Sequence, residues 1–440
     1  MPGRMEFDVG FGRAGRRRDD EEPMRLLVLG DFSGSPASER PPLASRPARR
    51  VDLDSLDHVL QRYQPRVTMP AGEIHFERLD DFHPDRLYAR LDLFQALRQA
   101  RSKPPVESAD LLGRLLGKPA DSGPPPSATG LDALIRDVVA PHIVKDTSGH
   151  VAYVAGVDAA IAEQMRVLLH APAFQALEAA WRAVHWAISS LELDENLQLH
   201  LLDVTREELL ADVVGAQGQL DQTGLYRAVV DRWRNVPGSA GWSAFVALTE
   251  FGPSDSDVGL LAALGLVVSK AGAPLIAGAD LALARDEAAT SGWPALRRSE
   301  AARWIALAAP RVLLRLPYGK KSDPIEAFAF EEVTGPPEPH EFLWGRSSLA
   351  LAILIGRAFT AKGWDMRPGD ERELGDLPAY TFVRDGEREM QPCGERFLTE
   401  RDIDTFVKAG LVPIASRRDR NGVVAVRFQS IADPPEPIAW

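Results

Sequence analysis

The feature that most restricts the fold is a short apolar run, Val312–Leu316, between Pro310 and the turn residues at 317–319. A run of this length bounded by turn residues predicts a buried strand. Proline at both ends agrees with this, because proline is tolerated where no ladder hydrogen bond is needed. The pattern of residues 299–307 predicts a short helix leading into the run.

Charged residues lie beside this run and shortly after it. Arg311 and Arg315 flank the apolar segment, and Glu326, Glu331 and Glu332 follow it. Because a buried charge must be paired, we expect arginine–carboxylate pairs here. Enzymes of many kinds also bury paired charges, so the pattern alone identifies no function.

Predicted strands and helices alternate along the rest of the chain. Strands are expected at 24–29, 73–78, 196–204, 243–249, 273–278, 379–383, 411–415 and 423–428, and helices at 52–63, 84–101, 157–169, 174–191, 256–271, 348–362 and 399–408. The alternation in 196–204 predicts a half-buried strand, and Thr205 with Glu208 predicts a capping box for a following helix. The order of elements indicates an α/β fold.

The chain divides into five regions by composition. Residues 1–23 form an expected flexible arm, in which Met5, Phe7, Val9 and Phe11 alternate with polar residues ahead of a charged block. Such a strand has no local partner and must pair elsewhere. Residues 104–130 are rich in Pro, Gly and Ser and predict a linker between regions 24–103 and 131–430, while 431–440 form a proline-rich tail.

Composition excludes several function classes. A net charge of −12 over 440 residues argues against binding to nucleic acid or to an anionic membrane. The single cysteine, Cys393, excludes an intrachain disulfide and multi-cysteine metal sites. No apolar run reaches membrane-spanning length, so we expect a cytoplasmic protein.

No motif predicts a catalytic, cofactor or metal site. Ser33 follows a strand, but its glycines have the wrong spacing for a nucleophile elbow. Lys320 lies in a GKKS sequence, but the earlier glycine of a phosphate-binding loop is replaced by Leu314. The nine histidines do not cluster, and nothing near Cys393 in the sequence suggests an activated thiol.

Two sets of motifs resemble subunits of the type VI secretion contractile sheath. RW at 303–304, APRVLLRLPYG at 309–319, PIEAFAFEE at 324–332 and LWG at 343–345 resemble the large subunit (TssC, or VipB), as do FQALEAAWRAVH at 174–185 and LLDV at 201–204. LVLGDFSG at 27–34 and LDDFHPD at 79–85 resemble the small subunit (TssB, or VipA). The resemblance covers residues 24–100 and 131–430, as if the two subunits were fused.

The resemblance implies a mixed-sheet TssB/TssC sheath-like fold and a structural role in a sheath, or in an accessory, cap or adaptor. It implies other sheath subunits as partners, with the Hcp inner tube, the baseplate and the unfoldase ClpV as further candidates. It also implies that interface contacts or structural charge pairs are formed by Arg311, Arg315, Glu326, Glu331, Glu332 and Trp344. An enzyme whose residues converge only in three dimensions is the alternative.

The chain departs from the large-subunit pattern after 427–430. Family members continue into strands that complete a handshake domain with neighbours, whereas this chain continues only to Trp440. From this difference we expect an incomplete handshake domain and a monomer or small oligomer, which joins a sheath only through another subunit by way of residues 5–11.

Overall fold

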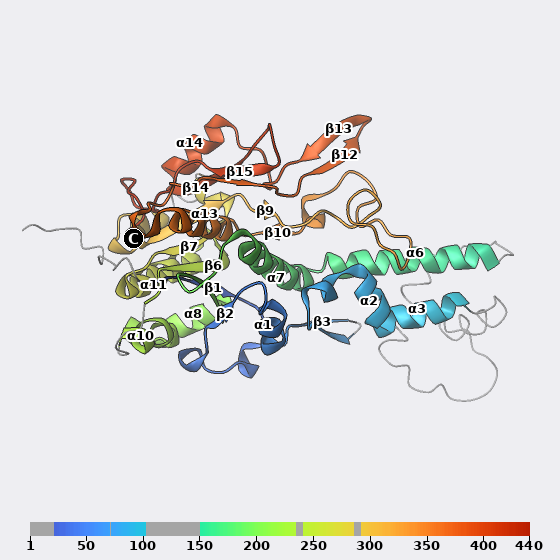
Figure 1. Cartoon of the computed structure of the whole chain (residues 1–440), viewed down its shortest axis with the longest axis horizontal. Coiled ribbons are helices and arrows are strands. Elements are labelled where there is room, and N and C mark those ends of the chain that lie inside the picture. Colours follow the sequence, from blue (N-terminus) through green and yellow to red (C-terminus); the bar gives the residue numbers. More distant parts are fainter. Residues whose placement is uncertain (1–21, 71, 103–149, 235–240, 286–291) are drawn as a thin grey trace, which may run out of the picture.

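The nine strands of a large mixed sheet form the centre of the protein (Figure 1). The structure is a computed structural model that describes residues 22–70, 72–102, 150–234, 241–285 and 292–440. The strand order is β11-β15-β14-β8-β7-β6-β1-β5-β2. Their bounds are β1 Met24–Gly30, β2 Arg49–Val51, β5 Leu197–Asp203, β6 Ala244–Phe251, β7 Leu275–Ala279, β8 Ile305–Ala309, β11 Glu373–Gly375, β14 Leu411–Ser416 and β15 Gly422–Ala425. The strands from β5 to β14 run parallel, and β2, β15 and β11 are antiparallel to their neighbours.

Strand β1 joins the N-terminal part of the chain to the rest. It pairs with β5 from Met24↔Leu197 to Gly30↔Asp203, and with β6 on its other side. All seven of its residues are buried, which confirms the predicted buried strand. The near-continuous apolar sequence fits this position, because a parallel strand at the centre of a sheet is covered on both faces.

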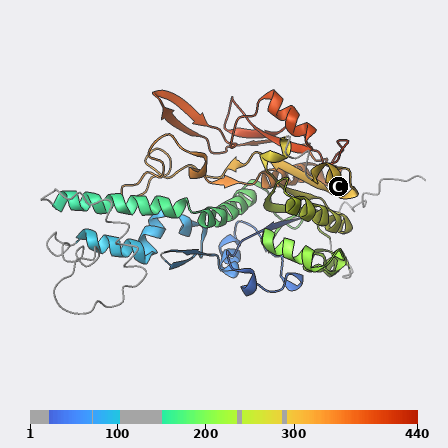
Figure 2. The same cartoon turned by 180° about the vertical axis from the view of Figure 1, so that it is seen from behind.

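Helices cover both faces of the sheet (Figures 1 and 2). Leu26 and Val28 of β1 point into one core, while Leu27 and Leu29 point into the other. The first core contains α1 Leu56–Tyr63, α6 His150–Leu169, α7 Pro172–Ser190 and α13 Ser347–Lys362. The second contains α8 Arg206–Gly215, α9 Gly224–Tyr226, α11 Asp255–Ala271, α12 Trp293–Arg297 and α14 Glu400–Lys408.

A helical extension projects from one end of the sheet. Helices α2 Pro84–Arg90 and α3 Asp92–Ser102 lie beside α6, as both views show (Figures 1 and 2). Arg101 Nε lies 2.6 Å from Asp158 Oδ1, and Tyr153 Oη donates to the Ala100 carbonyl at 3.1 Å. The extension thus also joins the N-terminal part to the later part of the chain.

In the part of the chain that the structure describes, three two-stranded sheets lie outside the main sheet. They pair β3 Arg66–Met69 with β4 Gly72–His75, β9 Val312–Leu313 with β10 Trp344–Gly345, and β12 Tyr380–Arg384 with β13 Glu387–Gln391. The proline-rich residues 431–440 lie against β8 and the 3-10 helix before it. The Ile431 amide donates to the Ile305 carbonyl at 2.9 Å, and the Ala439 amide donates to the Arg303 carbonyl at 2.8 Å.

The structure corrects four predicted elements. Residues 299–307 are not helical throughout, because a 3-10 helix at Glu300–Trp304 is followed by β8, an inner strand of the sheet. The predicted strand Val312–Leu316 pairs only at Val312–Leu313. The helix expected at 84–101 breaks at Leu91, and β5 is buried on both faces instead of half-buried. In β8 and β5, pairing with strands distant in the sequence outweighs the local pattern.

The strongly patterned helices are confirmed. The helix expected at 174–191 forms as α7 and buries one apolar face, and the helix expected at 348–362 forms as α13, which is buried almost all round. Thr205 with Glu208 forms the expected capping box. The predictions for the arm at 5–11 and the linker at 104–130 lie outside the described residues.

Candidate functional site: the junction between the two regions

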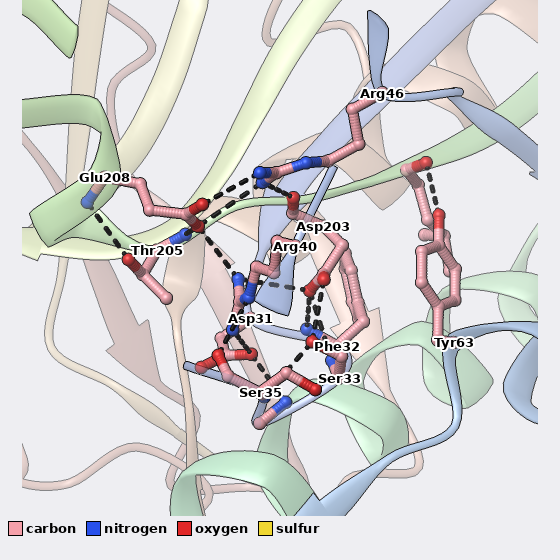
Figure 3. A network of polar contacts seen from close by, with 12 residues as sticks. Asp31, Phe32, Ser33, Ser35, Arg40, Arg46, Tyr63, Asp203, Thr205 and Glu208 are labelled. Carbon is pink, nitrogen blue, oxygen red and sulfur yellow. Dashed lines mark hydrogen bonds and ion pairs between the residues drawn. The ribbon is translucent and has the colours of Figure 1, made fainter. Parts of the chain in front are cut away.

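Asp203 organises the carboxyl ends of β1 and β5, where the two parts of the chain meet (Figure 3). Its Oδ1 accepts hydrogen bonds from the amides of Phe32 and Ser33 at 2.7 and 3.1 Å. Its Oδ2 accepts a hydrogen bond from Ser33 Oγ at 2.8 Å. Asp203 and Ser33 are both buried. Their hydrogen bond therefore holds the turn after β1 in place.

Two arginines from the loop after β1 close this edge of the sheet (Figure 3). Arg40 Nη1 lies 3.0 Å from Glu208 Oε2, and its Nη2 lies 2.6 Å from Asp31 Oδ1. Arg46 Nη2 lies 2.8 Å from Glu208 Oε1, and its Nη1 donates to the Asp203 carbonyl. Open α/β sheets bind ligands outside the carboxyl ends of their strands. Here the protein's own arginines occupy that place.

The electrostatics of this junction favour charged arginine–carboxylate pairs. Burial raises the pKa of Glu208, but the hydrogen bond from Arg46, the amide of Thr205 and the charge of Arg40 outweigh it, so the pKa is lowered overall. For Asp31 burial prevails over Arg40, and the pKa is raised. Glu208 therefore remains ionised between the two guanidinium groups.

A second buried network lies around Arg315, which follows β9 in the sequence. Its guanidinium bonds Glu178 through Nε at 2.9 Å, and Glu332 through Nη1 at 2.8 Å and Nη2 at 3.1 Å. Glu178 and Glu332 are almost completely buried, at 0% and 1% side-chain exposure. Arg182 Nε also donates to Glu178, at 2.6 Å. Two arginines and two glutamates thus balance one another inside the protein.

Hydrogen bonds to Tyr318 and contact with His170 complete this network. The Tyr318 amide donates to Glu332 Oε2 at 2.7 Å, and Arg182 Nη2 donates to the Tyr318 hydroxyl at 2.7 Å. His170 Nε2 lies 3.4 Å from Glu332 Oε1. Burial opposes ionisation of Glu332, but the Arg315 charge and these donors outweigh it and lower its pKa to about 2.

The segment between Tyr318 and Glu332 contacts the N-terminal part of the chain. Asp85, at the start of α2, accepts hydrogen bonds from the amides of Glu326 and Ala327 at 3.2 and 3.0 Å. The rings of Tyr88 and Phe328 stack with centroids 4.5 Å apart. The motifs at 79–85 and 324–332, far apart in the sequence, therefore touch each other.

The sequence-predicted residues do not share one site. Arg315 and Glu332 pair in the buried network, whereas Arg311 pairs with Glu395 at 2.9 and 2.5 Å. Trp344 is buried and donates from Nε1 to the Pro339 carbonyl at 2.7 Å. Glu326 and Glu331 are exposed. Met5, Phe7, Val9 and Phe11 lie outside the described residues.

Sequence reasoning missed Glu178 and the Arg40–Arg46–Glu208 set. Glu178 interrupts the apolar stripe of α7 between Leu177 and Trp181, and a charge in such a stripe was the signal that could have identified it. Arg40 and Arg46 lie in a polar loop, where nothing distinguishes a buried arginine from a solvated one.

The rejected chemical motifs occupy ordinary structural positions. Lys320 is exposed in a turn, and Cys393 is buried, which raises the pKa of its thiol. Within the described ranges, no three His, Cys, Asp or Glu side chains gather as a metal site requires. The helices in the same ranges include none with the length and apolarity needed to span a bilayer.

Fold and site together define an α/β protein in which two regions share one sheet and are joined by buried ion pairs. Comparisons with known proteins agree. Residues 151–432 match the model of the VipB tail sheath N-terminal domain, and residues 4–120 match the VipA family of the type VI secretion system. The chain therefore belongs to the family of type VI secretion sheath proteins, with a VipA-like and a VipB-like part.

Two relatives come from Pseudomonas aeruginosa. The type VI secretion system sheath protein TssC1 is 31% identical over 305 residues, which cover 64% of this chain and 61% of TssC1. The sheath protein TssB1 is 30% identical over 125 residues, which cover 26% of this chain and 69% of TssB1. The chain thus spans about three fifths of TssC1.

Proposed function

We propose that the chain is a structural subunit of a type VI secretion sheath, or a sheath-like accessory, cap or adaptor, that acts through protein–protein assembly. The observation that carries this is the insertion of β1, from the VipA-like part, between β5 and β6 of the VipB-like part. A shared sheet makes both parts one assembly unit. Other sheath subunits are the proposed partners, with Hcp, the baseplate and ClpV as further candidates.

The ion-pair networks support a structural role over the enzyme alternative. At the carboxyl edge of the sheet, Arg40, Arg46, Asp203 and Glu208 bond one another. The hydrogen-bonding groups of these four residues are already used in contacts that join the two parts. We therefore propose no catalytic activity. From the sheath family we also propose that assembly takes place in the cytoplasm.

Expression of residues 1–104 and 127–440 as separate chains tests whether the two parts form one unit. The two fragments should co-purify, because β1 of the first fragment pairs with β5 and β6 of the second. Val28→Asp in the first fragment should abolish this, because it puts an unpaired carboxylate on a fully buried strand. Leu53→Asp, at a side chain that is 58% exposed, is the matched control. Two soluble fragments that elute apart would contradict the proposal.

The sheath role itself is tested by adding the purified full chain to assembling sheath subunits of the same secretion system. Negative-stain microscopy and co-sedimentation should show the chain on tubular assemblies. A chain that stays in the supernatant under conditions where sheaths form would overturn the role, even if the split fragments pair.

A further inference from the structure

A pocket of about 310 Å³ lies between α7 and the segment that contains β10. One wall is the alanine-rich face of α7, with Ala176, Ala179 and Ala183. The other wall includes Trp344 of β10, the strand that pairs with β9. Neither ion network described above contributes a charged side chain to its lining.

Two arginines line this pocket from separate parts of the sequence. Arg311 precedes β9, and Arg346 is the N-cap residue of α13. Their side chains are 33% and 32% exposed. Each is held by a carboxylate that is not part of the lining, Glu395 for Arg311 and Glu250 for Arg346. These pairs fix the position of both guanidinium groups.

The remaining donors suit an incoming carboxylate. Arg311 uses Nε and Nη2 for Glu395, and Arg346 uses Nη1 for Glu250, which leaves Nη1 of the first and Nε and Nη2 of the second for other acceptors. Guanidinium groups bind carboxylates by charge-assisted, often bidentate hydrogen bonds. The positive amino end of α13 begins at Arg346 and adds to the attraction for an anion.

We propose that this pocket binds a carboxylate group, presented by a Glu or Asp side chain of an extended segment in a partner protein. The small alanine side chains of α7 let a peptide backbone approach closely, and Trp344 supplies an apolar contact for the side-chain stem. A small free dicarboxylate would present the same carboxylate group to the pocket. Because Glu250 and Glu395 balance the two arginines, binding of an isolated carboxylate is weak and gains strength only within a larger contact.

The test uses the full chain labelled with fluorotryptophan and observed by fluorine NMR. The Trp344 resonance is assigned by its loss in Trp344→Phe. The probes are acetyl-Ala-Glu-Ala amide, its isosteric Gln counterpart, and glutarate, all at constant ionic strength. The Glu peptide should shift the Trp344 resonance, while the Gln peptide should leave it unchanged.

Variants separate the pocket from general effects on folding. Arg346→Gln combined with Glu250→Gln removes the pair without leaving a lone charge, and should weaken Glu-peptide binding by about tenfold. Arg384→Gln, at an exposed arginine outside the pocket, should bind as the unmodified chain does. Thermal unfolding of each variant establishes that it is folded.

Each outcome decides the proposal. A shift with the Glu peptide that weakens in the double variant supports it. A shift with glutarate but none with the Glu peptide would overturn the assignment to a partner protein and would point to a free acid instead. Equal shifts with Glu and Gln peptides, equal binding by the double variant, or no shift with any probe would overturn it. Failure here leaves the proposed sheath role intact, because that role is tested by co-sedimentation.

Discussion

Arg40 Nη1 lies 3.0 Å from Glu208 Oε2, so a loop of the VipA-like part is bound to the first turn of a helix in the VipB-like part. Glu208 also bonds Arg46 and the Thr205 amide. One carboxylate thus holds two arginines and caps its own helix at the boundary between the regions.

We predict that Glu208→Gln destabilises the protein by about 3–5 kcal/mol, because it leaves two buried guanidinium groups without their shared partner. The neighbouring Glu207 is 78% exposed, and Glu207→Gln should change stability by less than about 0.5 kcal/mol. Urea unfolding followed by tryptophan fluorescence measures both. Equal stability of the two variants would show that the junction does not depend on Glu208.

The two motif arginines should differ in their contribution to stability. Arg315 is buried and shared between Glu178 and Glu332, so Arg315→Met should cost about 3–5 kcal/mol. Arg311 and Glu395 form a partly exposed pair, and Arg311→Met should cost about 0–1 kcal/mol. Thermal and urea unfolding compare them, and a larger loss at Arg311 would contradict the assignment.

Acid should weaken the Arg315 network through Glu332. Its pKa falls from 4.5 in its ordinary state to about 2 in the folded protein, so the folded state binds fewer protons than the unfolded state. The stabilisation is fully present above pH 4.5 and is lost as the pH falls toward 2. Urea unfolding across this range should show a smaller decline for Glu332→Gln than for the unmodified chain. Parallel declines would contradict this origin.

Two glycines of α11 should respond oppositely to alanine. A Cβ at Gly265 would lie 2.7 Å from Ile305 Cδ1 and 2.9 Å from Ala301 Cβ, so Gly265→Ala should cost about 1–3 kcal/mol through overpacking. A Cβ at Gly259 would meet nothing within 4 Å, and Gly259→Ala should stabilise the helix by about 0.5–1 kcal/mol. Calorimetric unfolding should separate the two variants in opposite directions. A stabilised Gly265→Ala would show that α11 does not pack closely on β8.

The elements with the strongest local patterns could be predicted from the sequence. The apolar run Leu26–Leu29 of β1, the stripe of α7 and the apolar surface of α13 each indicate a buried element. Capping at Thr205 is equally local, because the hydroxyl and Glu208 lie within one helical turn of each other. The motifs at 27–34 and 309–319 likewise indicated the family, which the comparisons confirm.

The contacts between distant segments could not be predicted in this way, because they depend on how the whole chain packs. Strand β8 contains four alanines or leucines, a composition that also suits a helix. It is a strand because it pairs with β7 and β14 in the sheet. Glu178 and Glu395, rather than the nearby Glu326 and Glu331, became arginine partners because packing brought them within hydrogen-bond distance. A local sequence pattern indicates which residues of a segment are buried. The pairing of charges depends instead on the distances between side chains, which are determined only when the chain folds.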